Sequence, residues 1–221
     1  ATDEQAEAMV RAADAHLLEP ALGGYRLNTE FGAVPANLGR CFGFAFGHKE
    51  NGAMFSHMAV MYANALYKRG LAHAGHKVLD GIFEHCRNFT TSRIYPGIPE
   101  YINARGRGMY TYLTGSASWL LLTLTNKVFG VKGDLGDLVL EPQLVGAQFD
   151  ADGSATINLT FAGRRMQITV HNPQRLDAGT YRIGSVTLDQ TPITNAPGTT
   201  SARISRETLV ALDATQLHHI Q

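Results

Sequence analysis

The sequence has no excess of charge of either sign. Nineteen lysines and arginines balance nineteen aspartates and glutamates in 221 residues, and charged residues make up 17% of the chain. Proteins that bind nucleic acid through its phosphates concentrate basic residues. The composition therefore predicts no nucleic-acid partner, and we expect a small molecule as the ligand.

Cysteine is also scarce. Cys41 and Cys86 are the only two, and they do not form a Cys-x-x-Cys pair. This excludes a disulfide framework and a cysteine-based zinc site. His48 and His57 belong to different predicted elements and have no identifiable third partner, so we expect no metal site.

A membrane-spanning run is missing as well. The most apolar stretch, residues 119–131, is interrupted by Thr123, Thr125, Asn126 and Lys127 and is too short to cross a bilayer. Residues 1–7 lack the basic and then apolar pattern of a secretion signal. We therefore expect a cytoplasmic protein without a membrane partner.

Hydrophobic residues make up 44% of the chain, enough to bury a core of its own. Apolar spacing predicts helices at residues 2–18, 54–68, 71–89 and 115–129. The short connection at Gly70 predicts that the second and third helices form an antiparallel hairpin. Residues 24–50 and 90–112 read as two long loops, which we expect to line one cleft.

After Gly133 the pattern changes to the period-two alternation of strands. The connecting turns are predicted at Asp152-Gly153, at Ala162-Gly163 and around Gly179. Residues 206–220 fit either an edge strand or a short helix. The alternating segments are residues 135–142, 155–161, 165–171, 180–183, 186–189 and 201–205.

One stretch combines features of an anion site. Residues 105–119 place Arg105 and Arg107 among glycines, followed by a Thr-Gly-Ser turn that opens into an apolar helix. Thr114 or Ser116 can cap that helix, and its first N–H groups are unpaired and carry partial positive charge. An ordinary capped helix after a flexible loop explains the same residues.

Four motifs, in this order, resemble the C-terminal part of glycoside hydrolase family 94, the inverting β-glucoside phosphorylases. The segment at residues 58–69 is most similar to the branch that acts on 1,2-β-oligoglucans. The resemblance covers about residues 23–142. The motifs are Lys-Glu-Asn-Gly-Ala-Met-Phe-Ser-His at 49–57, Gly-Ile-Pro-Glu-Tyr-Ile at 97–102, Tyr-Leu-Thr-Gly-Ser-Ala-Ser-Trp at 112–119, and Val-Phe-Gly-Val-Lys-Gly-Asp-Leu-Gly-Asp-Leu-Val-Leu-Glu-Pro at 128–142.

The resemblance implies an α + β multidomain fragment. Residues 1–132 would be part of an (α/α)6 barrel, and residues 133–221 a C-terminal antiparallel β-sandwich-like domain. In the family, inorganic phosphate is the co-substrate and no cofactor is needed. Phosphate attacks the anomeric carbon of a β-glucoside while an Asp protonates the leaving oxygen, and a sugar 1-phosphate is released.

Carried over to this chain, the phosphate-contacting residues of the family are His57, Thr114 and Gly115. The Arg105 and Arg107 guanidinium groups suit phosphate or sugar hydroxyls, although a solvated loop is the alternative. Four further residues are candidates for sugar binding; each has an ordinary structural alternative, such as helix capping, ion pairing or core packing. They are Glu50, Glu100, Tyr110 and Tyr112.

The sequence departs from the family in one important respect. Residues 20–57 and 90–119 contain no Asp, so the general acid of the family has no equivalent in either loop. The expected partners are then a β-glucooligosaccharide, phosphate and the remainder of the barrel or another chain completing it, and a homodimer is left open. The competing hypotheses are a non-catalytic sugar-binding or structural fragment and the phosphorylase-like region of a β-1,2-glucan synthase.

Overall fold

The computed structural model describes residues 1–221 except 35, 40–42, 95–96, 112–113 and 194–196. Cys41 and Tyr112 lie outside the described residues. The chain divides into two compact units, Ala1–Thr123 and Leu124–Gln221. The boundary expected between residues 132 and 133 falls inside the strand β6 (Val131–Asp134).

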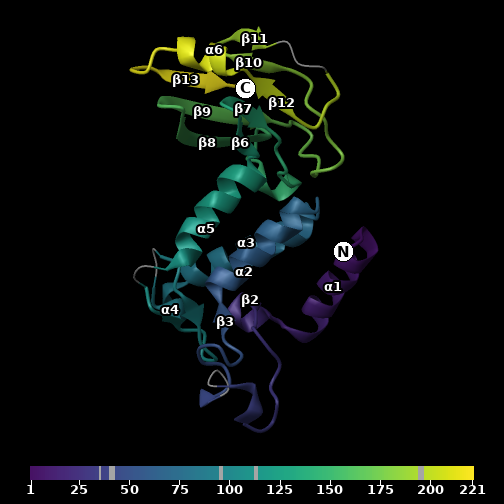
Figure 1. The fold of residues 1–221 in the computed structure, drawn as a ribbon, viewed down its shortest axis with the longest axis vertical. Coiled ribbons are helices and arrows are strands. Elements are labelled where there is room, and N and C mark those ends of the chain that lie inside the picture. Colours follow the sequence, from purple (N-terminus) through teal and green to yellow (C-terminus); the bar gives the residue numbers. More distant parts are fainter. Residues whose placement is uncertain (35, 40–42, 95–96, 112–113, 194–196) are drawn as a thin grey trace. The chain divides into compact units, whose positions relative to one another are not determined.

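The first unit is mainly helical (Figure 1). Thr2 caps the first helix with a capping box, in which its hydroxyl accepts from the Gln5 amide and the Gln5 side chain accepts from the Thr2 amide. The second helix begins at Ser56, two residues later than predicted, because Met54 and Phe55 form a short strand. The helices are α1 (Asp3–His16), α2 (Ser56–Lys68), α3 (Ala72–Arg87), α4 (Phe89–Ser92) and α5 (Gly115–Thr123).

The helix α2 packs against α3 and against α5. The connection between α2 and α3 turns at Gly70, whose φ of 73° is a conformation that glycine adopts without strain. The fourth predicted helix, residues 115–129, is present but changes from α-helix to π-helix within its length. α5 ends at Thr123, and the π-helical turn η4 (Leu124–Val128) opens the second unit.

Short paired strands lie within and beside the segments predicted as long loops. The strand β1 (Leu18–Glu19) pairs with β2 (Gly24–Tyr25) around the turn η1 (Pro20–Leu22). A three-stranded antiparallel sheet joins β3 (Met54–Phe55), β4 (Tyr101–Ile102) and β5 (Gly108–Met109). A further turn, η2 (Ala36–Leu38), lies in the first long segment.

The second unit consists of two sheets. One has the order β11-β10-β13-β9-β8 and the other β12-β7-β6. The eight-residue strands β8 and β9 pair along their whole length, from Ser154↔His171 to Phe161↔Arg164. The strands are β6 (Val131–Asp134), β7 (Asp137–Leu140), β8 (Ser154–Phe161), β9 (Arg164–His171), β10 (Val186–Leu188), β11 (Thr191–Ile193), β12 (Ala202–Ile204) and β13 (Leu217–Ile220), with the turn η5 (Gly146–Gln148).

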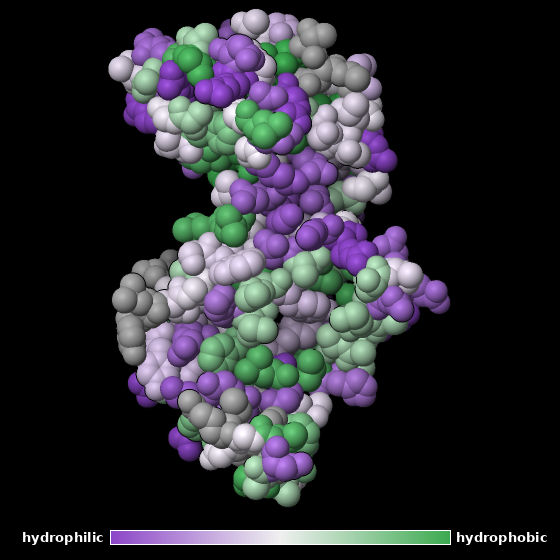
Figure 2. Space-filling view, in the orientation of Figure 1, coloured by the Kyte–Doolittle hydropathy of each residue, from purple (hydrophilic) through white to green (hydrophobic). Residues whose placement is uncertain are grey.

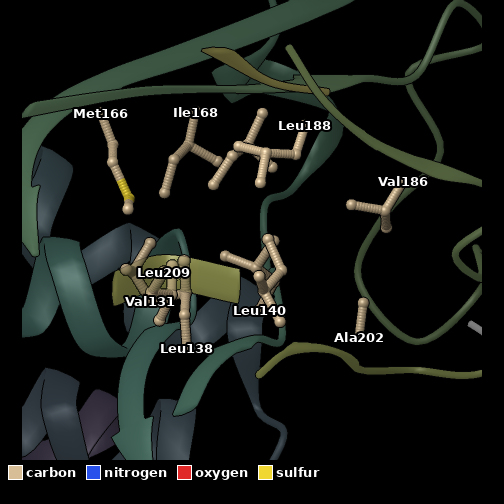
Figure 3. Close-up of a cluster of buried hydrophobic side chains, with 11 residues drawn as sticks. Val131, Leu138, Leu140, Met166, Ile168, Val186, Leu188, Ala202 and Leu209 are labelled. Carbon is tan, nitrogen blue, oxygen red and sulfur yellow. The ribbon is translucent and has the colours of Figure 1, made fainter. Parts of the chain in front are cut away.

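Both sheets contribute side chains to one hydrophobic core, drawn in Figure 3. The alternation along each strand turns every second residue inward, as period-two patterning requires. The helix α6 (Arg206–Ala211) adds Leu209 to the same core. The buried residues are Val131, Leu138, Leu140, Met166, Ile168, Val186, Leu188, Ala202, Ile204, Leu209 and Ile220.

The C-terminal segment differs from the expectation of an edge strand or a helix, because it forms both a helix and a strand. After α6, β13 inserts between β9 and β10 in the middle of its sheet. β13 runs parallel to β9, from Leu217↔Arg165 to Ile220↔Ile168, so this sheet is mixed and not entirely antiparallel.

Candidate functional site

The small sheet β3-β4-β5 brings three distant segments of the first unit together. Phe55 pairs with Tyr101, and Tyr101 pairs with Met109. The sheet is extended at its end by the Ser56 amide, which donates to the Glu100 carbonyl at 2.9 Å, and by the Glu100 amide, which donates to the Tyr110 carbonyl at 2.9 Å. The start of α2, Glu100 and Tyr110 are therefore fixed side by side.

The start of α5 is attached to the same sheet. Ser116 is fully buried, and its hydroxyl donates to the Pro99 carbonyl at 3.1 Å. Its amide donates to the Thr114 hydroxyl at 3.2 Å, so Thr114, one of the two predicted candidates, caps the helix. The remaining first-turn amides of α5 have no acceptor within the helix and give its start a partial positive charge.

His57 lies directly against this helix start. A Cβ atom placed on Gly115 would fall 2.7 Å from Cε1 and 3.1 Å from Nε2 of the imidazole. The Nε2 atom is buried and has no hydrogen-bond partner among the described residues. Trp119, one turn further along α5, lies 6.1 Å from the imidazole between ring centroids. The predicted proximity of His57 to the helix start is thus present, whereas its binding to phosphate stays a prediction.

Glu50 supplies a second polar atom of the same kind. Its Oε2 is buried, and no described residue forms a hydrogen bond with it. A buried polar group without a partner costs about 1–3 kcal/mol, so such atoms often mark the place where a ligand is bound. Glu50 lies in a tight turn formed by residues 48–51, in which the Asn51 amide donates to the His48 carbonyl at 3.1 Å.

The phenol of Tyr101 is influenced electrostatically by the carboxylates of Glu50 and Glu100. Burial raises the pKa of Tyr101; Lys49 opposes this shift, whereas Tyr110, Glu100 and Glu50 add to it. Tyr101 is buried and stacks on Phe55, with ring centroids 5.6 Å apart and an angle of 16° between the planes. The Lys49 ammonium and the carboxylates of Glu50 and Glu100 therefore act on the Tyr101 phenol in opposite directions.

The Tyr110 ring, predicted to stack on sugar, is in contact with Lys49 and Tyr101. The Lys49 ammonium lies over its ring, 4.1 Å from the centroid, and the Tyr101 ring is tilted against it at 5.9 Å. Tyr110 remains 37% exposed. Tyr112, the other tyrosine predicted to contact sugar, lies outside the described residues.

Arg105 and Arg107 lie at the other end of the β4-β5 hairpin. Both side chains are exposed, and both main-chain amides donate to the Asn103 side chain, at 2.9 Å and 3.1 Å. Among the described residues, we find no contact between either guanidinium group and His57 or Gly115. The contact of Arg105 and Arg107 with phosphate therefore stays a prediction.

Sequence reasoning missed Lys49 and Tyr101. Each directly adjoins a carboxylate that was singled out, Lys49 before Glu50 and Tyr101 after Glu100. The signal available in the sequence was this adjacency within two motifs. The place of Tyr101 depends on the pairing of β4 with β3 and β5, and strands of two residues leave no recognisable pattern in the sequence.

The described residues contain no group of three or more His, Cys, Asp or Glu side chains that could hold a metal ion. Within the same part of the chain, none of the helices combines the length and apolar character that a membrane span requires.

Comparison with known proteins relates the chain to phosphorylases. No family model matches it. It is 27% identical over 202 residues to N,N'-diacetylchitobiose phosphorylase of Vibrio proteolyticus, a match that covers 87% of this chain and 24% of that protein. It is 26% identical over 162 residues to cellobionic acid phosphorylase of Neurospora crassa, covering 65% of this chain and 20% of that protein.

Both relatives are phosphorylases by name, and the comparison supports a relationship to glycoside phosphorylases at this general level. The chain spans about a quarter of the length of the first relative and a fifth of the second.

Proposed function

We propose that this chain is the C-terminal region of an inverting glycoside phosphorylase of the family 94 type. In the proposed reaction an oxygen of inorganic phosphate attacks the anomeric carbon of a β-glucoside. The bond to the leaving oxygen breaks, and a sugar 1-phosphate forms. The observation that carries the proposal is the buried, unpartnered Nε2 of His57 beside Gly115 at the start of α5.

The start of α5 offers phosphate two kinds of donor. Unpaired helix amides favour an anion through their N–H groups and through the partial positive charge of the helix end. The imidazole of His57 adds an N–H donor when Nε2 carries a proton. Close approach to this point requires a residue without Cβ, and Gly115 is that residue. Thr114 would contribute its hydroxyl or main chain.

Glu50 and Glu100 are proposed to bind the sugar. A buried carboxylate oxygen accepts hydrogen bonds from sugar hydroxyls, and the unpartnered Oε2 of Glu50 is suited to this. The general acid is proposed to lie outside this chain, because the segments around the site contain no Asp. A 1,2-β-linked glucooligosaccharide is the substrate that the resemblance favours, and no cofactor is required.

The remainder of the barrel is the proposed partner. The helix α1 has no buried residue, and Met58 and Met61 of α2 are exposed by 50% and 36%. Between α1 and α2 lies an apolar groove of about 530 Å³, and apolar side chains are visible on the surface of the first unit in Figure 2. Helices that complete the barrel would cover this groove and supply the acid.

The test is phosphorolysis by the full polypeptide that contains this chain, with a panel of β-linked glucose disaccharides and oligosaccharides. Formation of a sugar 1-phosphate is expected. His57→Ala should raise the KM for phosphate roughly 10- to 100-fold, because it removes a charge-assisted hydrogen bond of about 1.5–3 kcal/mol. His171→Ala, at an exposed position in the second unit, is the matched control and should leave the KM unchanged.

An unchanged KM for phosphate in His57→Ala would contradict the assigned phosphate site. Oligosaccharide binding without any sugar 1-phosphate would instead favour the sugar-binding alternative.

A further inference from the structure

Lys49 adopts a backbone conformation that lysine normally avoids. Its φ is 50°, and it is the first of the two central residues of the turn at 48–51. A positive φ at this position is characteristic of turns that favour glycine. For other residues the conformation is strained, and strain of this kind is concentrated at functional sites. Glycine would adopt the backbone conformation of residue 49 with less strain, yet the turn has a lysine there.

That side chain makes a specific contact. The ammonium group lies 4.1 Å from the centroid of the Tyr110 ring. Hydrogen bonding to the Tyr110 side chain holds the pKa of Lys49 above its ordinary value, so the contact involves the charged form. Tyr110 itself has a φ of 55°. Two residues in strained conformations thus face each other across the site.

Tyr110 is in turn fixed to the sheet that positions the helix starts. Its carbonyl accepts from the Glu100 amide at 2.9 Å, and its ring is tilted against Tyr101 at 5.9 Å. Tyr101 stacks on Phe55, which immediately precedes α2. The Lys49 side chain therefore connects the turn to the sheet β3-β4-β5, which leads directly into the helix that carries His57.

The next residue along the turn is Glu50, and its Oε2 is buried without a described partner. Neighbouring residues of the turn thus send their charged groups to different places: the Lys49 ammonium onto Tyr110, and the Glu50 carboxylate into the interior. The contact with Tyr110 attaches the Lys49 side chain outside the turn, whereas main-chain hydrogen bonds such as that from the Asn51 amide to the His48 carbonyl close the turn itself.

We propose that Lys49 and Tyr110 form a positioning pair that holds the Glu50 carboxylate in the orientation needed to bind the sugar. This inference rests on the proposed function of the site. It also assigns Tyr110 a role different from stacking on sugar, since its ring serves as the seat of the ammonium group. Lys49 acts through Glu50 and has no contact with phosphate.

The kinetic test uses the full polypeptide and measures KM separately for sugar and for phosphate. Lys49→Met should raise the KM for the sugar roughly 3- to 30-fold, the range expected for loss of a cation–π contact, with the KM for phosphate unchanged. Lys49→Arg keeps the cation over the ring and should restore a nearly normal KM. Lys68→Met, at the exposed end of α2, is the matched control.

Two further variants separate the contact from the turn. Lys49→Gly relieves the backbone strain but removes the contact with Tyr110, and it should raise the KM for the sugar as Lys49→Met does. Tyr110→Leu should have the same effect, and combining it with Lys49→Met should add little, because both remove one interaction. Full additivity, an unchanged KM for the sugar, or an equal change in the KM for phosphate would overturn the proposal.

A structural readout keeps this test independent of catalysis. Crystal structures of the wild-type protein and Lys49→Met should differ at residues 48–51, with the Glu50 carboxylate displaced in the variant. An unmoved carboxylate would overturn the positioning role even in an active enzyme. A wild-type protein that forms no sugar 1-phosphate would refute the proposed function, while this comparison would still decide the role of Lys49.

Discussion

The imidazole of His57 occupies the space that a side chain at residue 115 would need. A Cβ on Gly115 would lie 2.7 Å from Cε1, 3.0 Å from Nδ1 and 3.1 Å from Nε2 of His57. Cβ contacts below 3.0 Å are essentially not observed, so either the ring or the helix start would have to move. α5 is held next to the segment before β4 by the hydrogen bond from Ser116 to Pro99, and it packs against α2, which carries His57.

Gly115→Ala is predicted to displace the His57 ring from the start of α5. The KM for phosphate should rise about tenfold or more, because the imidazole and the helix amides no longer converge. Overpacking should also lower the free energy of unfolding by about 1–3 kcal/mol. Steady-state kinetics and urea unfolding measure the two effects. At Gly184 an added Cβ meets nothing within 4 Å, so Gly184→Ala should change neither quantity.

Ser116 and Ser118 provide a matched pair for testing how α5 is held. The buried hydroxyl of Ser116 donates to the Pro99 carbonyl at 3.1 Å, whereas the exposed Ser118 donates to the Gly115 carbonyl at 3.1 Å. Ser116→Ala should lower the free energy of unfolding by about 1–3 kcal/mol, because the Pro99 carbonyl loses its buried donor. It should also raise the KM for phosphate.

Ser118→Ala should change stability by less than about 0.5 kcal/mol, since only an exposed contact is lost. Equal effects of the two substitutions would show that the bond to Pro99 does not hold the helix start.

The buried His218 predicts how stability depends on pH. Nδ1 of its ring lies 2.7 Å from the Asp189 carboxylate and Nε2 lies 2.8 Å from the Asp213 carbonyl. Both neighbours are acceptors, so both ring nitrogens must carry protons. The hydrogen bond to Asp189, together with the one to Asp213, raises the pKa of His218. Burial opposes ionisation of Asp189, but hydrogen bonds from His218 and the His219 amide outweigh it and lower the pKa of Asp189.

The signs of these two shifts define a window. The raised pKa of His218 stabilises the fold fully at pH values below the pKa of about 6.5 that histidine has in the unfolded chain. This contribution is lost as pH rises through the pKa of His218 in the folded protein. The lowered pKa of Asp189 stabilises the fold above the ordinary aspartate pKa of 3.8, and this contribution is lost as pH falls through the folded pKa. The pair should therefore stabilise the second unit most between about pH 4 and 6.5.

Asp189→Asn should lower the free energy of unfolding at pH 6 by only about 0.5–1 kcal/mol, because solvent screens the 41% exposed carboxylate, and it should flatten the decline above pH 6.5. Urea unfolding followed by circular dichroism at a series of pH values measures both. Asp152→Asn changes an exposed turn residue in the same unit and is the control. A variant that keeps the wild-type slope would exclude His218 as its origin.

Features encoded within a few neighbouring residues were predictable from the sequence. The first helix and the turn at Ala162-Gly163 were both predicted, since each depends on local hydrogen bonding or backbone preference. The strands β3, β4 and β5 were not, because two residues are too few to show alternation. The parallel insertion of β13 beside β9 joins residues far apart in the chain, and no local pattern encodes it.

The candidate site divides in the same way. The helix start at Thr114 was visible from its capping residues, and the association with His57 came from the resemblance to a family and not from spacing. The contact between Lys49 and Tyr110 was not foreseeable, because it requires the register of a sheet and a positive φ at both residues. Sequence patterns indicate whether a residue faces the core or the solvent. They do not indicate strained backbone conformations that distant contacts maintain.

The turn between β8 and β9 offers a substitution that should increase stability. Ala162 and Gly163 have φ values of 48° and 73° and connect the paired residues Phe161 and Arg164. A two-residue hairpin turn with both φ values positive favours Asn-Gly, because asparagine tolerates the left-handed region better than alanine does.

Ala162→Asn should raise the free energy of unfolding by about 0.5–1 kcal/mol, whereas Ala162→Val should lower it because a β-branched residue is strained at positive φ. The same alanine-to-asparagine change at Ala151, an exposed turn residue without positive φ, should have little effect and serves as the control. Urea unfolding of the three variants measures the order of stability. If Asn and Val at residue 162 prove equally stable, then backbone strain does not limit this hairpin.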